Sequence, residues 1–197
     1  MSIHIYSVLL LASILLIYVN SADPIKSYSI RKDFFKGFKA GEFSIRDTSG
    51  KHLYYRIESN YAKLHSLKII AYPSKQEVGR LKAVEKLLVY KAEISILDPR
   101  TNQWVLGLIE KNFQLFGSLF KINWNGNHLK MENDIGLFTT KFLDKNGQLL
   151  AQFRLQNSSV FWTKKYDMQI FSTKYPEQIY LLGLAAHDHT SSGKRHG

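Results

Sequence analysis

Short runs of alternating hydrophobic and polar residues recur along this chain, and turn residues separate them. Alternation with a period of two is typical of a β-strand that buries one face. Three of the runs end in an aspartate and lead through a short turn into the next run. They are 43–47 into 52–57, 94–98 into 104–109, and 142–144 into 149–155. Because a hairpin has one apolar face and two unpaired edges, a chain of such hairpins must close into a barrel or pack as a sandwich.

Further runs extend this series of strands. Asn125 and Gly126 stand between two strand-like runs and form the strongest short hairpin signal in the chain. Residues 78–89 fit both helical spacing and alternation, and the alternation that continues without a break to residue 96 favours a strand. The remaining predicted strands are 28–32, 64–70, 159–162 and 166–171.

The last element has a different pattern. Pro176 and Glu177 are helix-start residues, and 179–186 is apolar on every side. A helix that is hydrophobic all round belongs inside a fold, so the pattern predicts a barrel that holds its own C-terminal helix. An ordinary final strand is the alternative, and Ala185 and Ala186 favour the helix. Residues 187–197 are polar and are predicted to fray as a tail.

The chain begins with an uncharged apolar stretch that is typical of a secretory leader. Residues 6–19 are nearly all apolar and too few for a comfortable membrane span. We expect a signal peptide at 1–21 with cleavage after Ser21, and an uncleaved anchor is the alternative. One domain at 22–190 and a flexible tail at 191–197 would follow. In a secreted chain, Asn157 heads a glycosylation sequon.

Charge and cysteine content narrow the classes of partner. With 27 basic and 16 acidic residues the chain carries a formal charge of +11, which attracts anions. For a secreted protein this predicts an anionic membrane surface or a sulfated glycan as partner rather than nucleic acid. Lysines that serve solubility and protect strand edges are the alternative. The chain has no cysteine, which excludes disulfides and thiolate chemistry.

Two basic segments that also contain aromatic residues are the candidate binding site. Aromatic rings beside lysines at a loop tip suit a membrane interface, where rings enter the headgroup layer and ammonium groups meet phosphates. The alternative is that these rings belong to the core and their basic neighbours are only solvated. The proposed lipid- or polyanion-binding residues are Arg31, Lys32, Lys36, Lys39, Lys164 and Lys165, which accompany Phe34, Phe35, Phe38, Phe161 and Trp162.

Motifs for catalysis or metal binding are weak. An aspartate at a turn bonds its own backbone two residues further on, which accounts for the three hairpin aspartates. His187, Asp188 and His189 offer two imidazoles without a third ligand nearby. The chain also has no nucleophile elbow, zincin helix or glycine-rich phosphate loop. We therefore expect a non-enzymatic monomer with no cofactor, metal site or catalytic residue.

In order, these features resemble the LURP-one-related group of the tubby-like superfamily. The resemblance covers nearly all of the chain after the leader and rests on 28–30, 43–47 with Gly50, 55–57, 144–147 and 179–186. It implies a closed twelve-stranded antiparallel β-barrel around one buried C-terminal helix, a fold shared with tubby proteins and phospholipid scramblases. Tubby proteins bind phosphoinositides and scramblases act on phospholipids. Family members are usually intracellular, and the phosphoinositide pocket, the calcium ligands and the lipidated cysteines of these relatives have no counterpart in this chain.

Together these observations predict a secreted barrel protein that binds anionic phospholipid headgroups or another polyanion through a basic surface. A lipocalin-like carrier of a small apolar ligand is the first alternative, although its Gly-x-Trp motif is only Gly41-Glu42-Phe43 here. A structural or interaction protein is the second. The position of 179–186 separates the first two, because a helix inside the barrel leaves no chamber for a ligand.

Overall fold

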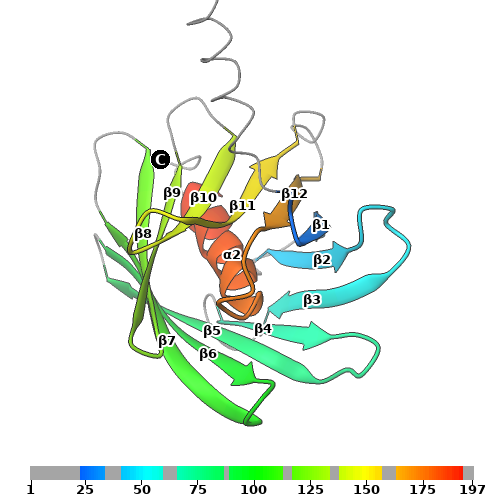
Figure 1. Ribbon diagram of the computed structural model, residues 1–197, viewed down its shortest axis with the longest axis horizontal. Coiled ribbons are helices and arrows are strands. Elements are labelled where there is room, and N and C mark those ends of the chain that lie inside the picture. Colours follow the sequence, from blue (N-terminus) through cyan, green and yellow to red (C-terminus); the bar gives the residue numbers. More distant parts are fainter. Residues whose placement is uncertain are drawn as a thin grey trace, which may run out of the picture.

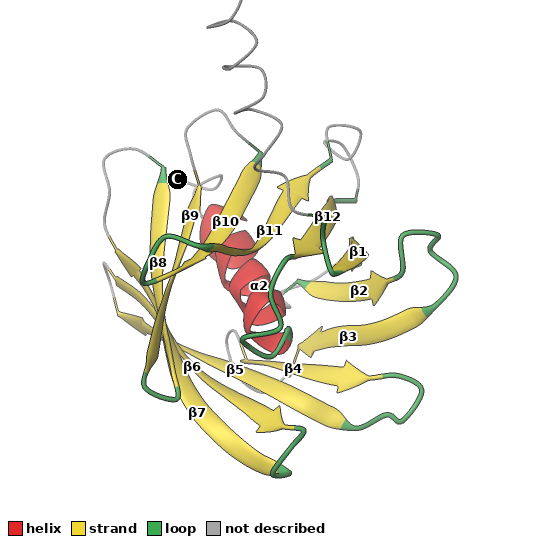
Figure 2. Ribbon diagram, viewed as in Figure 1, coloured by secondary structure: helices red, strands yellow, loops and turns green. Residues whose placement is uncertain are grey.

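In the computed structural model the chain forms a closed barrel of twelve antiparallel strands around a C-terminal helix (Figure 1, Figure 2), which confirms the predicted mainly β architecture. The structure describes residues 23–33, 41–59, 66–86, 89–112, 117–133, 138–156 and 163–192. The strands are β1 Lys26–Asp33, β2 Glu42–Arg46, β3 Leu53–Ser59, β4 Ser66–Ala71, β5 Glu77–Lys86, β6 Val89–Asp98, β7 Gln103–Asn112, β8 Ser118–Trp124, β9 Asn127–Asn133, β10 Thr139–Asp144, β11 Leu149–Leu155 and β12 Lys165–Ile170, and the helix is α2 Gln178–Ser192.

Pairing of the first strand with the last closes the barrel. Every other strand pairs with its neighbours in the sequence, and β1 pairs with both β2 and β12. The β1–β12 register runs from Lys26 opposite Ile170 to Arg31 opposite Lys165. Closure leaves no strand with a free row of backbone hydrogen-bonding groups, so it solves the edge problem that hairpins create.

The predicted turn signals act as expected at one end of the barrel. The side chain of Asp98 accepts a bond of 2.8 Å from the backbone N–H of Arg100, and Asp144 accepts one from Asn146 in the same way. Asp47 accepts its backbone bond from His52, at the far end of its turn. The three hairpin aspartates thus have structural roles. Asn125 and Gly126 have φ values of 48° and 72°, and two successive positive values are what a two-residue type I′ hairpin requires.

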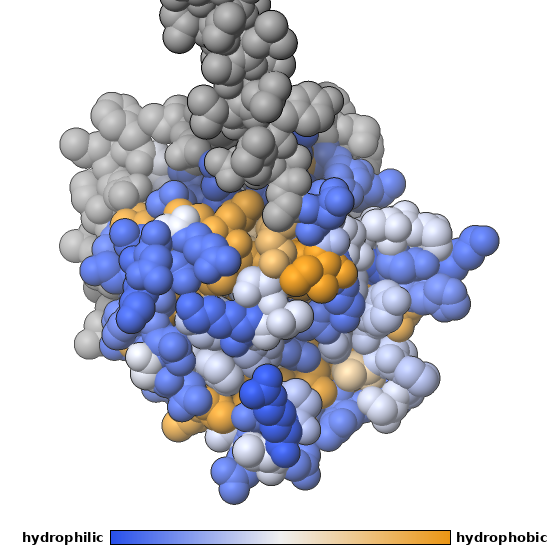
Figure 3. Space-filling model, in the orientation of Figure 1, coloured by the Kyte–Doolittle hydropathy of each residue, from blue (hydrophilic) through white to orange (hydrophobic). Residues whose placement is uncertain are grey.

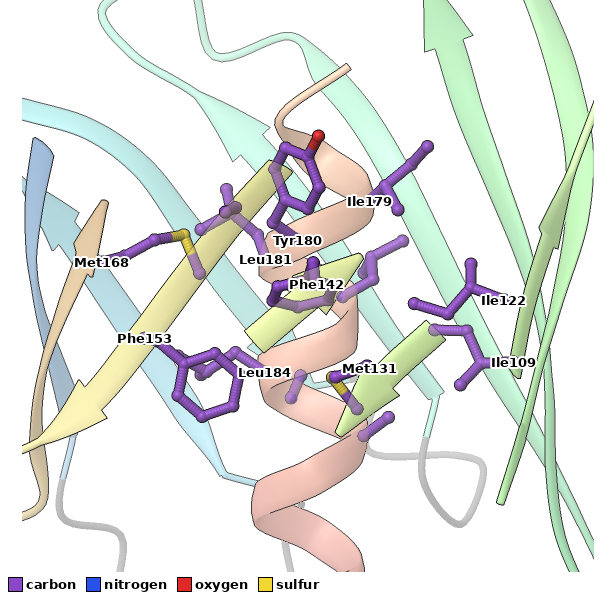
Figure 4. Packing of buried hydrophobic residues seen from close by; sticks show 14 of the residues in the cluster. Ile109, Ile122, Met131, Phe142, Phe153, Met168, Ile179, Tyr180, Leu181 and Leu184 are labelled. Atoms are coloured by element: carbon purple, nitrogen blue, oxygen red, sulfur yellow. The ribbon is translucent and has the colours of Figure 1, made fainter. Parts of the chain in front are cut away.

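Helix α2 lies along the barrel axis and forms the centre of the core (Figure 4). Its residues from Ile179 to Ala186 are buried. They contact inward-facing side chains such as Phe142, and a Cβ built at Gly183 would lie only 2.6 Å from that ring. The helix is apolar all round because strands surround it on every side. It therefore occupies the space in which a carrier of the lipocalin kind would hold its ligand.

The helix is longer than the sequence pattern predicts. It continues to Ser192, so the prediction of a frayed tail beginning at residue 187 is wrong for 187–192. The reason is that polar residues there have partners or aromatic neighbours inside the barrel: Asp188 binds two lysines, and the ring of His187 lies against that of Phe153. Polarity indicates exposure only when such partners are missing.

Several sequence predictions lie outside the described residues. They are the leader at 1–21, the strand at 159–162 and the end of the tail at 193–197. The strand preference for the ambiguous segment is confirmed, since Glu77–Lys86 is β5. No helix within the described part of the chain combines the length and the apolar character needed to span a bilayer.

Candidate functional site

Two of the predicted lysines face the interior of the barrel and bind one buried carboxylate. The Nζ atoms of Lys32 and Lys164 lie 2.5 and 2.7 Å from the oxygens of Asp188, whose side chain is 3% exposed. The hydroxyl of Tyr166 donates a third bond, of 2.7 Å, to the same carboxylate. Lys32 donates its backbone N–H to the carbonyl of Lys164, which places the two side chains together at the end of β1 and just before β12.

This Asp188 cluster ties the last turns of α2 to the barrel wall. Burial by itself would raise the pKa of Asp188, but the charges and hydrogen bonds of Lys32 and Lys164 outweigh burial and lower that pKa below its usual range. Burial and the nearby carboxylate raise the pKa of the Tyr166 hydroxyl far above its usual value. The carboxylate is therefore ionised and the phenol neutral near neutral pH, and the two ammonium groups are engaged within the fold.

A second carboxylate anchors the other end of the helix. Glu177, immediately before α2, accepts hydrogen bonds from the hydroxyls of Tyr28 at 2.6 Å and Tyr55 at 2.5 Å. Lys26 adds an ion pair of 3.0 Å. Burial and then the Glu177 carboxylate raise the pKa of both tyrosines. The helix is thus held to β1 and β3 at its start and to β1 and β12 near its end.

The other two described residues of the predicted site lie on the outer wall. Arg31 on β1 and Lys165 on β12 are direct cross-strand partners, and both are exposed. Neither forms an ion pair with any residue that the structure describes. Like charges directly opposite each other on one face of a sheet destabilise it. Arg154, also exposed, lies on the neighbouring strand β11, directly opposite the exposed Asp167 of β12, so this wall holds three cations and one acid among these positions.

The remaining predicted site residues lie outside the part of the chain that the structure describes. They are Lys36, Lys39 and the glycosylation candidate Asn157, together with the aromatic residues predicted to accompany the lysines. The structure thus divides the four described basic residues into an internal pair, Lys32 and Lys164, and an external pair, Arg31 and Lys165.

Sequence reasoning missed a second external pair of cations. Lys121 on β8 and Lys130 on β9 stand directly opposite each other, and both are exposed. Among the described residues neither forms an ion pair, although Glu110 is the direct cross-strand partner of Lys121 on β7; Glu110 binds Lys91 on its other side, at 3.1 Å. The signal was available: the two-residue turn at 125–126 fixes the register of its hairpin and so places these lysines face to face.

No protein-family model, curated protein or solved structure matches this chain. The site must therefore be interpreted from its own chemistry. Within the described ranges, no three His, Cys, Asp or Glu side chains gather in a way that could hold a metal ion. What the geometry provides is a filled interior and an outer wall with two pairs of facing cations.

His187 is the most perturbed base in the described chain. It lies in α2 between the rings of Phe120 and Phe153, with centroids 6.2 and 5.4 Å away, and its Nδ1 is buried without a hydrogen-bond partner among the described residues. Burial lowers the pKa of His187 to about 4, which the nearby Asp188 opposes and Lys111 assists. The imidazole is therefore neutral at neutral pH.

Proposed function

We propose that the protein is a secreted, non-enzymatic barrel of the tubby-like kind that binds anionic phospholipid surfaces with its outer wall. The observation that carries the proposal is the pair of facing cations that occurs twice, Arg31 with Lys165 and Lys121 with Lys130. Each arrangement costs stability in the free protein, because like charges face each other and, although Glu110 and Asp167 stand beside the two pairs, no described acid forms an ion pair with them. An anion placed across either pair would remove that cost.

The filled interior of the barrel also favours binding at its outer surface. Helix α2 fills the barrel, so a bound molecule of any size has to meet the outer wall. A lysine close to an anionic membrane contributes about 1 kcal/mol, so one facing pair would supply about 2 kcal/mol, or roughly thirty-fold in affinity. That gain depends on ionic strength, because exposed charges are screened within about 8 Å in physiological salt.

The family resemblance supports the same proposal. Its motifs follow one another in the order of a tubby-like barrel, and the last of them, 179–186, lies in the central helix. The relatives named by the resemblance act at phospholipid membranes. A carrier function receives less support, because α2 occupies the space that an apolar ligand would need.

The test is co-sedimentation of the purified protein with vesicles of phosphatidylcholine alone or mixed with phosphatidylserine, at about 0.05 M and about 0.5 M NaCl. We expect binding only to the mixed vesicles at low salt, and release at high salt. A heparin column serves as the second arm, since sulfated glycans present the same negative charge without a membrane. Retention by heparin without vesicle binding would replace lipid by glycan as the ligand. Absence of binding to both would overturn the proposal.

A further inference from the structure

One outer strand of the barrel carries an apolar stripe where a solvent-facing wall should be polar. Trp104, Leu106 and Leu108 occupy alternate, outward-facing positions of β7, with Ile109 buried on the inner side. Leu106 is 73% exposed and Trp104 is 36% exposed. The three residues span about 13 Å along the strand. Single exposed apolar residues need no explanation, whereas a row of them marks a contact surface.

A half-buried apolar neighbour widens the stripe at its Trp104 end. Leu97 on β6 is the direct cross-strand partner of Trp104. Val84 on β5 is 37% exposed and also faces outward, but it stands apart from the stripe with Lys91 as its direct partner on β6. Seen from one side, the molecule is mostly hydrophilic, with hydrophobic patches between the polar residues (Figure 3). The wall of β5 to β7 is thus partly apolar on the outside, although the core lies on its inner side.

Cations border this apolar wall. The guanidinium of Arg80 on β5 lies 4.1 Å from the ring centroid of Trp104, a cation–π contact. On the other side of β7 come Lys121 and then Lys130, the facing pair described above. Acids on the same wall have bases beside them: Glu110 binds Lys91, Glu77 binds Arg80, and the exposed Glu93 stands directly opposite Lys82 and next to Leu108. The border is positive at Lys121 and Lys130, which form no ion pair with a described residue.

We infer that the outer wall of β5 to β9 is the face that contacts the anionic phospholipid surface, with Trp104 and Leu106 entering the headgroup layer. The inference rests on the proposed function and names the surface that performs it. An indole ring beside a cation suits the membrane interface, where the ring lies among headgroups and the cation reaches phosphate. Lys121 and Lys130 can bind headgroups through their ends while their stems cover apolar surface.

The chemistry of the wall favours a membrane over a protein partner. A second copy bound through the same surface would bring the border cations of both copies, Arg80, Lys121 and Lys130, into one interface, because a two-fold interface joins identical patches. Strand addition is excluded for this closed barrel, because no edge is left to pair. A sulfated glycan would satisfy the lysines but would leave Leu106 in water.

The two cationic pairs face different sides of the barrel. In the closed strand order β9 is three strands from β12 and β8 is five strands from β1, so the two pairs lie about a third of the way round the barrel from each other. One flat membrane can therefore meet the Lys121 wall or the Arg31 wall, and variants of each wall tell them apart. Ile25, next to β1 and 61% exposed, gives a control for Leu106 on the other side.

The experiment measures vesicle partitioning of full-length variants in phosphatidylserine-containing membranes at low salt. We expect Leu106→Asp and Trp104→Ala each to weaken partitioning by roughly ten-fold or more, and Ile25→Asp by less than about two-fold. The double variant Lys121→Gln with Lys130→Gln should weaken it by roughly thirty-fold, while Arg31→Gln with Lys165→Gln has little effect. Lipids brominated near the headgroup should quench tryptophan emission of the wild type, and quenching should fall in Trp104→Ala.

The outcomes separate the inference from the proposed function. If wild-type protein does not bind vesicles, the proposed function fails. If it binds, but the loss follows Arg31 and Lys165 rather than Leu106 and Lys121, the proposed function stands and this inference is overturned. All of the substituted side chains are on the outer surface, so no variant should unfold at a markedly lower temperature than the wild type, and the two double variants, which remove facing cations, should unfold at the same or a slightly higher temperature. That measurement confirms that a loss of binding is not a loss of fold.

Discussion

Neutralising Asp188 should destabilise the protein far more than neutralising a surface carboxylate. In Asp188→Asn the side chain keeps its size, but the ammonium groups of Lys32 and Lys164 lose their counter-charge in a site where the carboxylate is 3% exposed. Removing one partner of a buried ion pair costs about 3–5 kcal/mol. The lysine side chains are 23% and 27% exposed and so can partly reach water, which places the expected cost near the lower limit, at about 3 kcal/mol.

The measurement is urea unfolding at neutral pH, with Glu58→Gln as the matched control. Glu58 pairs with Lys68 at 3.3 Å, and the Glu58 and Lys68 side chains are 29% and 44% exposed against 3% for Asp188, so this variant should lose less than about 1 kcal/mol. For a chain of this size a loss of about 3 kcal/mol corresponds to a fall of about 6–12 °C in Tm. Equal effects of the two substitutions would refute the reasoning, because the Asp188 cluster would then contribute no more than a solvated pair.

The dependence of stability on pH in the acid range should reveal the contribution of the Asp188 cluster. The folded-state pKa of Asp188 lies below its unfolded value, so the stability that the carboxylate contributes is complete above about pH 4. That contribution is lost as the pH falls through the folded-state pKa. Asp188→Asn should lack this part of the acid dependence. An unchanged acid profile in the variant would contradict the assignment.

Two further predictions concern α2. His187 has a pKa of about 4 when folded against 6.5 in the unfolded chain, so below pH 6.5 the unfolded state binds the extra proton and stability falls. His187→Leu should therefore remove about 2 kcal/mol of the stability loss between pH 7 and pH 5, and equal losses in both proteins in urea titrations would contradict it. Gly183→Ala should lower the free energy of unfolding by about 1–2 kcal/mol, because the added Cβ would lie 2.6 Å from the Phe142 ring. This clash should cost more than alanine gains in helix propensity. A Tm at or above that of the wild type would exclude the clash.

Local signals made much of the fold predictable. The Asp-containing turns and Asn125–Gly126 bond or bend the backbone with their own atoms, so their effect is visible in a few residues. The apolar segment 179–186 is continuous and needs no partner to be recognised. The end of the helix was not predictable in this way. Asp188 lies 156 residues from Lys32, and no local pattern shows that the two meet.

The candidate site, like the fold, was predictable where local signals determine it and not where distant segments meet. Lys121 and Lys130 can be placed opposite each other from the turn between them. Arg31 and Lys165 both appear in the sequence prediction, but their pairing depends on the closure of β1 onto β12, which is a property of the whole barrel. Alternation does place Lys32 on the same face as Tyr28 and Ile30 and Arg31 on the other face, but it does not show that a carboxylate from the far end of the chain meets Lys32 inside the barrel.

The position of α2 at the end of the chain has a consequence for how the protein is made. The segment that fills the barrel, 178–192, is synthesised after all twelve strands. Strand β1 can pair with both of its neighbouring strands only after β12 has been made. A growing polypeptide of this design exposes its inward-facing residues until translation is nearly over. The barrel can therefore close and bury those residues only after its last strand and helix have been made, so folding is completed at the end of synthesis.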